Sequence, residues 1–134
     1  MMSQENVELS LLMIEAWTRR DAEALIALSD PEVVGSAPFE EITEGVTYRG
    51  HDGVRQYCEN LAELSEENRF ERVELYDLGD QVLGLGRIWF RFASGVELGD
   101  REGAFLLTWR NEKCIESRLF LSHAGAREAA GLPE

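Results

Sequence analysis

The sequence contains few of the residues on which disulfide-bonded, zinc-binding or redox-active proteins depend. Its 134 residues include two cysteines, Cys58 and Cys114, and two histidines, His51 and His123. The cysteines lie far apart and in no CxxC or CxxH pattern, so their spacing predicts neither a disulfide framework nor a zinc site. The histidines form no i, i+4 pair of the kind that holds a metal on a helix. We therefore expect no metal and no cofactor.

Basic residues are also scarce, with 13 Lys and Arg against 26 Asp and Glu and a formal net charge of -13. Such a field repels phosphate groups, and no segment clusters basic residues with aromatic ones. We expect no binding to nucleic acid or to a membrane surface. Acidic pairs such as Glu40-Glu41 and Glu66-Glu67 are interpreted as solvated surface that favours solubility.

No apolar run approaches the roughly 18 residues that a membrane-spanning helix needs. The first residues, MMSQEN, also lack the basic start and apolar stretch of a signal peptide. With 44% apolar and 29% charged residues, the composition is that of a packed globular protein. The length favours one domain over residues 1–134, and we expect it in the cytoplasm.

Helical periodicity predicts three helices in the first half of the chain. Ser3 is a suitable cap for a helix that extends to Arg20, and Asp21 for a second helix over residues 22–28. A third helix is predicted after Gly50. Between the second and third helices lie a short candidate strand over residues 32–36 and a loop over 37–47, a candidate pocket lid.

The second half of the chain predicts an antiparallel meander of four strands. Hairpin-type turns separate four strand patterns, over residues 70–77, 81–93, 96–110 and 114–121. Ser122 then caps a short helix that ends at Gly131. Both faces of the strand over 81–92 are apolar, with Val82, Ile88 and Phe90 on one and Leu83, Leu85 and Trp89 on the other. One face suits the helices, and the other predicts a second subunit.

Five short segments occur in an order typical of one family and extend over nearly the whole chain. They are AWTRRD at residues 16–21, DPEV at 30–33, YRGHDGV at 48–54, LTWRN at 107–111 and EAAGL at 128–132. With them the chain resembles the SnoaL-like branch of the nuclear-transport-factor-two-like superfamily. The resemblance implies an α+β fold in which a curved antiparallel sheet wraps around three N-terminal helices as a cone with a central pocket. It also implies a short C-terminal helix and a homodimer formed through the outer sheet face.

The resemblance does not choose a function, because this superfamily includes ketosteroid isomerases, epoxide hydrolases, polyketide cyclases, dehydratases and members without known activity. Ketosteroid isomerase chemistry needs an aspartate base and two acidic hydrogen-bond donors. The matching positions hold Gly35, Met13 and Phe105, none of which can serve. The two aspartates and the arginine of the epoxide hydrolase pattern have no match either.

Strand parity supplies the candidate polar anchors. A two-residue turn at Ser94-Gly95 places Arg87, Trp89 and Arg91 on one face, which we assign to the pocket. An arginine in an apolar cone needs a partner, either an anionic ligand group or a structural partner such as Asp100, Glu102 or a neighbouring chain. A β-bulge within residues 99–103 would instead turn Phe105, Leu107 and Trp109 inward.

The aromatic residues of the cone can form a stacking wall for a flat ligand or simply its core. Glu102 and His123 are the candidates for an acid or base. The predicted ligand-binding residues are Arg87, Trp89, Arg91, Trp17, Phe105, Leu107, Trp109, Tyr57 and Leu119. The function that we predict is binding of a small, mostly apolar organic molecule. The alternatives are a weak isomerase, cyclase or hydratase, and a structural or partner-binding module. The sequence identifies neither a ligand nor a reaction.

Overall fold

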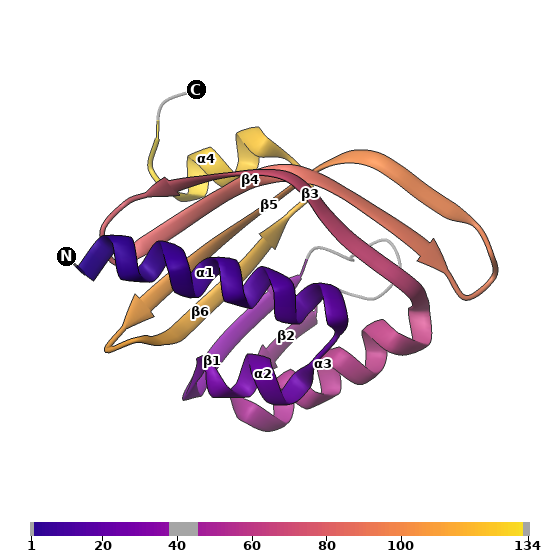
Figure 1. The fold of residues 1–134 in the computed structure, drawn as a ribbon, viewed down its shortest axis with the longest axis horizontal. Coiled ribbons are helices and arrows are strands. Elements are labelled where there is room, and N and C mark those ends of the chain that lie inside the picture. Colours follow the sequence, from indigo (N-terminus) through magenta and orange to yellow (C-terminus); the bar gives the residue numbers. More distant parts are fainter. Residues whose placement is uncertain (1, 38–45, 133–134) are drawn as a thin grey trace.

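Six strands form one curved sheet with helices on both faces in this computed structural model, which describes residues 2–37 and 46–132 (Figure 1). Across the sheet the order is β2-β1-β6-β5-β4-β3, with β1 and β6 parallel and the other neighbours antiparallel. In chain order the elements are α1 (Met2–Arg19), α2 (Ala22–Ala27), β1 (Ser29–Ala37), β2 (Val46–Arg49), α3 (Gly50–Leu64), β3 (Ser65–Asp77), β4 (Gln81–Phe92), β5 (Glu97–Arg110), β6 (Lys113–Phe120) and α4 (His123–Ala129).

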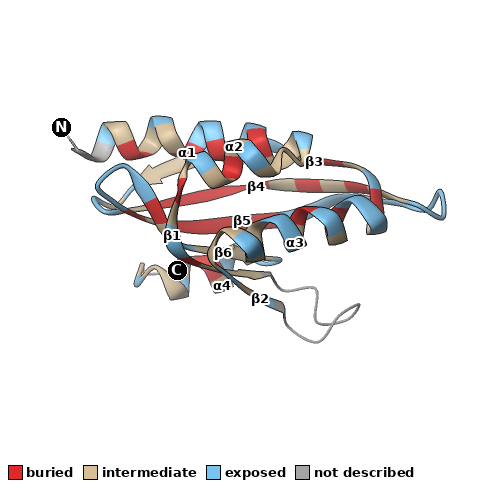
Figure 2. Cartoon of the chain, turned by 90° about the horizontal axis from the view of Figure 1, so that it is seen from below, coloured by how far each residue is buried: buried red, intermediate tan, exposed pale blue. Residues whose placement is uncertain are grey.

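The two faces of the sheet carry separate apolar clusters. On the inner face, Met13 of α1 and Leu25 of α2 pack with residues of β4 and β5 such as Val82 and Phe105. On the outer face, Ala126 of α4 packs with Leu83, Leu85, Ala104 and Leu106. Burial therefore runs along β4 and β5 through the middle of the molecule (Figure 2). The apolar outer face, from which a partner subunit was predicted, is covered at these residues by the chain's own last helix.

The predicted α+β order and the meander of four strands are confirmed. The Asp21 carboxylate accepts a hydrogen bond from the Ala24 amide, and the Ser122 hydroxyl accepts one from the Gly125 amide, so both predicted caps are present. At Ser3 the prediction was wrong, because α1 already begins at Met2. Residues 38–45 of the predicted lid lie outside the described residues.

Three strands differ from prediction, because local periodicity does not encode which strands pair with each other. β1 is longer than expected and pairs in parallel with β6, while β2 was not predicted and pairs with β1 at the sheet edge. β3 begins at Ser65, five residues earlier than predicted. Its polar start, SEENR, pairs with the end of β4. Tertiary pairing overrides a sequence that resembles a loop.

Buried polar contacts hold α1 on the sheet. The indole nitrogen Nε1 of Trp109 donates to Ser10 Oγ at 3.0 Å, and Ser10 donates in turn to the Asn6 carbonyl at 2.7 Å. At the other end of α1, Asn68 Nδ2 of β3 donates to the Trp17 carbonyl at 3.0 Å. Since Ser10, Asn6 and Asn68 are buried, these bonds fix the height and direction of the helix over the strands.

Replacing Ser10 by alanine should lower the free energy of unfolding by about 1–3 kcal/mol, because the buried Trp109 nitrogen loses its acceptor. Thr18→Ala is the matched control, since Thr18 also donates to the carbonyl four residues earlier but accepts no buried donor from the described residues. Both changes gain the same kind of helix propensity. Urea unfolding measures the two differences, and equal losses would contradict the role assigned to Ser10.

Candidate functional site

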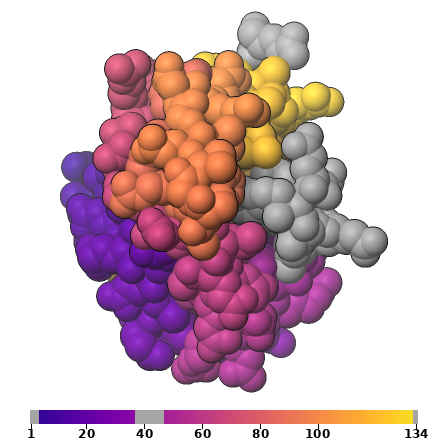
Figure 3. All heavy atoms as spheres, turned by 90° about the vertical axis from the view of Figure 1, so that its right-hand side faces the viewer, coloured from indigo at the N-terminus to yellow at the C-terminus, as the bar shows by residue number. Residues whose placement is uncertain are grey.

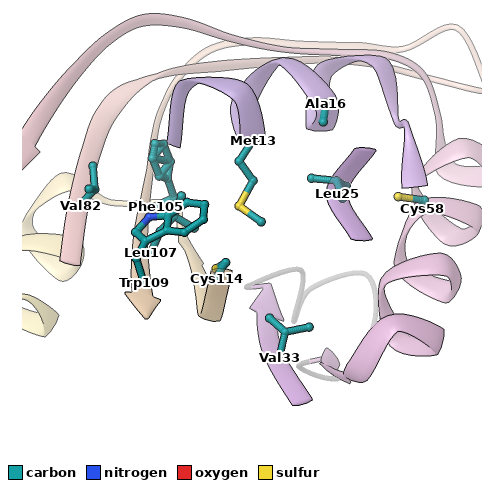
Figure 4. Packing of buried hydrophobic residues seen from close by; sticks show 10 residues of the cluster. All are labelled: Met13, Ala16, Leu25, Val33, Cys58, Val82, Phe105, Leu107, Trp109 and Cys114. Carbon is teal, nitrogen blue, oxygen red and sulfur yellow. The ribbon is translucent and has the colours of Figure 1, made fainter. Parts of the chain in front are cut away.

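A cavity of about 120 Å³ lies between the helices and the inner face of the sheet. An apolar cavity of roughly 150 Å³ in another protein holds a benzene molecule, so this one suits a molecule of about one ring. Figure 4 shows the Met13 side chain extending from α1 toward the space between β5 and Val33 of β1. The lining residues are Met13, Ile14, Trp17, Leu25, Ser29, Val33, Gly35, Ser36, Tyr48, Val54, Tyr57, Phe70, Phe105, Leu107, Ser117 and Leu119.

The lining carries no ionised side chain at neutral pH among the residues that the structure describes. Its polar groups are the hydroxyls of three serines and two tyrosines and the indole of Trp17. A charged group that entered this space would lose its hydration without gaining a counter-charge from the described wall.

Trp17 and Tyr57 join two walls of the cavity. The Trp17 indole donates to the Tyr57 hydroxyl oxygen at 2.8 Å, across the space between α1 and α3. The Tyr57 ring meets the Tyr48 ring edge to face, with centroids 4.9 Å apart, and Asn60 Nδ2 donates to the Tyr48 hydroxyl. Burial raises the pKa of Tyr57 well above its usual value, so its hydroxyl stays protonated at physiological pH.

Phe105 owes its position to a glycine on the neighbouring strand. Gly84 is its cross-strand partner, and a Cβ atom there would lie 2.3 Å from the Phe105 ring. The ring can lie on the β4 backbone only because that position has no side chain. From this place it contacts Phe70 at a centroid distance of 5.4 Å and forms one wall of the cavity.

The cavity contains Trp17, Tyr57, Phe105, Leu107 and Leu119, which are five of the nine predicted ligand-binding residues. Their position agrees with the prediction, and their part in binding remains a prediction. Trp109, the remaining predicted residue on the inner face of β5, is buried beside the cavity but does not line it, since its indole is engaged by Ser10.

Contrary to expectation, the side chains of Arg87, Trp89 and Arg91 do not line the cavity. Ile88 and Phe90 pack against Leu61 and Trp17 on the inner face, so the residues between and beside them point to the other face of β4. The parity was assigned wrongly because Gly84 and Gly86 interrupt the apolar pattern of the inner face.

The structure gives these three residues internal partners, which was the alternative to a ligand. Arg87 Nε lies 3.0 Å from Asp100 Oδ1. Arg91 lies 3.3 Å from carboxylate oxygens of both Glu66 and Glu67. Trp89 has the Arg69 guanidinium 4.1 Å from its ring centroid, in a cation-π contact.

The predicted β-bulge is confirmed. The register between β4 and β5 shifts between Ile88 and Phe90, whose partners are Arg101 and Leu98. Asp100, inside the bulge, has a positive φ of 51°. As the bulge prediction required, Phe105, Leu107 and Trp109 face inward.

Glu102 and His123 do not line the cavity and instead hold the start of α4. The Glu102 carboxylate accepts a hydrogen bond from the His123 amide at 2.8 Å, and this bond lowers the pKa of Glu102. The His123 ring nitrogen Nε2 lies 2.8 Å from the Gly86 carbonyl. These contacts account for both residues structurally.

Sequence reasoning missed part of the cavity wall, including Val33, Val54 and Ser117. Ser117 and Leu119 both face the cavity. Since alternate residues of a strand point to the same face, the predicted position of Leu119 could have identified Ser117 as well. The three positions associated with ketosteroid isomerase chemistry, Gly35, Met13 and Phe105, all line the cavity and leave those roles empty. Among the described residues no cluster of three or more His, Cys, Asp or Glu could hold a metal ion.

Glu102→Ala should lower the thermal unfolding midpoint at pH 7, because the first turn of α4 loses an acceptor. A lowered pKa in the folded state means that the carboxylate stabilises the fold above its ordinary value of 4.5 and ceases to do so as pH falls through the folded value. The difference from the wild type should therefore shrink below pH 4.5. Circular dichroism measures both, with exposed Glu97→Ala on the same strand as the control. Equal midpoints at pH 7 would contradict the capping role.

The chain matches the SnoaL-like domain family over residues 12–117. Similar solved structures include an NTF2-like protein of unknown function from Burkholderia pseudomallei, with 20% identity and a TM-score of 0.79 over 92% of this chain and 95% of that one. An NTF2-like protein from Burkholderia xenovorans has 24% identity and a TM-score of 0.77 over 95% and 96%. TerC, co-crystallised with polyporic acid, has 20% identity and a TM-score of 0.77 over 92% and 96%.

No curated protein matches the chain. At identities below 25%, the solved structures establish the fold and leave activity open. The family match covers more than half of the chain. It contains four of the five segments on which the resemblance was based. The protein belongs to the SnoaL-like domain family.

Proposed function

We propose that the protein binds a small, largely apolar organic molecule in the cavity between its helices and sheet. The observation that carries this proposal is a cavity of about 120 Å³ whose described wall is apolar apart from hydroxyls and one indole. Ligand sites are typically concave and apolar, with a few polar groups that orient the ligand. TerC, which has a similar fold, was co-crystallised with polyporic acid, in agreement with this use of the fold.

A binding role fits the wall better than a purely structural one. In a structural module we would expect Phe105 and Leu107 to fill the cone, and instead they border open space. Empty volume in a core costs stability, by about 24 cal/mol for each Å³ in one well-studied series. A ligand that occupies the cavity would recover such a cost.

A binding role is also better supported than the isomerase, cyclase or hydratase alternative. General acid-base catalysis needs a titratable group with a pKa near the working pH within hydrogen-bond reach of the substrate. Among the described residues, the lining offers only the tyrosine hydroxyls as acids, and burial moves the pKa of Tyr57 away from neutrality. We therefore propose that the described residues of the cavity bind a ligand and do not catalyse a reaction on it.

We also propose that the protein is a cytoplasmic homodimer. Cys58 and Cys114 are free and buried, which fits a reducing compartment. Because α4 covers Leu83, Leu85 and Leu106, these residues are not available to contact a second subunit. We propose instead that the subunits meet through the outer face of β1 and β6, where the apolar side chain of Val34 lies beside the carboxylate of Glu116.

Light scattering at micromolar concentration tests the dimer. The expected mass is twice that of one chain. Val34→Glu should shift the mass toward that of one chain, because it places a second carboxylate beside Glu116 on both copies. A wild-type protein with the mass of one chain would contradict the proposal.

Gly35→Val should abolish ligand binding without loss of stability. A Cβ at Gly35 meets no atom closer than 3.9 Å, and the position lies on a strand and lines the cavity, so valine suits the backbone while its methyl groups enter the space. Glu32→Val, an exposed change on the same strand, is the matched control.

Toluene serves as the probe, and the ¹³C-labelled methyl group of Met13 reports its binding by NMR. Met13 lines the cavity, and Met1 and Met2 are the other methionines of the chain. Toluene should shift the Met13 signal in the wild type and in Glu32→Val, but not in Gly35→Val. A wild-type Met13 signal that stays unchanged at saturating toluene would contradict the proposed function.

A further inference from the structure

The hydroxyl group of Tyr57 accepts a hydrogen bond but donates none to the described residues. Its oxygen accepts the Trp17 indole hydrogen at 2.8 Å, which fixes the side of the oxygen that faces α1. Its own hydrogen has no acceptor among the residues that the structure describes. A tyrosine hydroxyl can donate and accept at the same time, and buried donors in folded proteins nearly always have a partner. Tyr57 lines the cavity, so a molecule in the cavity can supply the missing acceptor.

Three other polar groups of the wall, those of Ser29, Tyr48 and Trp17, are less suited to this role. Ser29 donates its hydrogen to the Leu25 carbonyl at 2.7 Å and has none left for a ligand. Tyr48 accepts from Asn60, which itself accepts from Gln56, in a chain of contacts that leads to the exposed side of α3. Trp17 has one N–H, which Tyr57 occupies. Tyr57 is therefore the donor whose position is fixed from both sides, by Trp17 and by the Tyr48 ring.

The surroundings restrict the charge of the acceptor. The described wall holds no Lys, Arg or His, and the arginines of β4 are paired with carboxylates on the other face of the sheet. The chain as a whole carries a net charge of -13. A carboxylate or phosphate would enter without a counter-ion and against this field. A neutral oxygen acceptor pays neither penalty.

The shape of the wall restricts the remainder of the molecule. Trp17, Phe70 and Phe105 line the cavity, and Trp17 and Phe105 both contact the Phe70 ring, at centroid distances of 6.3 and 5.4 Å. Such rings favour a flat apolar body held by edge and face contacts. The volume limits that body to about one ring.

We propose that the cavity takes a neutral, ring-sized organic molecule with a carbonyl-type oxygen, and that the Tyr57 hydroxyl donates its hydrogen to that oxygen. This inference rests on the proposed function and names the ligand class for the same site. It takes the place of the arginine-bound anionic ligand that the sequence left open as one alternative. The Trp17 indole acts as a positioning group, because it holds the Tyr57 oxygen and directs the free hydrogen into the cavity.

Three probes of nearly equal shape test the proposal in the wild-type protein. Acetophenone carries a carbonyl oxygen, α-methylstyrene has a CH₂ group in its place, and benzoate has a carboxylate. The Met13 methyl signal gives the three dissociation constants. Acetophenone should bind about tenfold more tightly than α-methylstyrene, since the latter leaves the hydroxyl without an acceptor. Benzoate should bind most weakly.

Tyr57→Phe keeps the ring and removes the hydroxyl. In this variant acetophenone and α-methylstyrene should bind about equally tightly, and the affinity for α-methylstyrene should be the same as in the wild type. Infrared spectroscopy of bound acetophenone gives an independent readout in the wild type. A carbonyl that accepts a hydrogen bond has a lower stretching frequency than the same carbonyl in an apolar solvent, so we expect that shift even if the variant folds poorly.

The outcomes separate the two proposals. Equal binding of acetophenone and α-methylstyrene, without a carbonyl shift, would overturn the donor role of Tyr57 and leave the proposed function standing. Tighter binding of benzoate than of acetophenone would overturn the neutral ligand class. If none of the three probes moves the Met13 signal, the proposed function fails and this inference fails with it.

Discussion

The hydrogen bond from the Trp17 indole to the Tyr57 hydroxyl is the contact on which the cavity depends. It connects α1 to α3 through the ends of two large side chains, so the helix backbones are joined without lying close together. The Trp109-Ser10 bond fixes the middle of α1 on the sheet. At the end of the molecule seen in Figure 3, the β4-β5 hairpin lies against α3, where Leu61 packs with Phe90. Of the residues in these contacts, Trp17 and Tyr57 line the cavity.

Charge and cavity are separated in this fold. Arginines and carboxylates pair along β3, β4 and β5, as Arg87 does with Asp100 and Arg91 with Glu66. These pairs are largely exposed and add little stability individually. Because these charged groups lie outside the cavity, its described wall consists of apolar groups, hydroxyls and one indole. These groups determine which ligands the site can recognise. Among the residues whose burial the structure describes, no Asp or Glu is buried.

The fold could be predicted because its signals are local. Helical periodicity, caps at Asp21 and Ser122 and hairpin turns each depend on neighbouring residues, and all appear in the structure. The site could be predicted only in part, because Gly84 and Gly86 interrupt the apolar pattern on the inner face of β4. Sequence parity therefore assigned Arg87 to the cavity. The cover that α4 gives the outer face is a long-range contact that no local pattern encodes.

A crystal structure of protein purified from cells without added ligand tests the proposed ligand site most directly. We expect electron density in the cavity that the chain does not explain, within hydrogen-bond distance of the Tyr57 hydroxyl and against Trp17 and Phe105. We also expect Arg87 to stay paired with Asp100 on the other face. A cavity closed by collapsed side chains, or density held by Arg87 and Arg91, would contradict the proposed site.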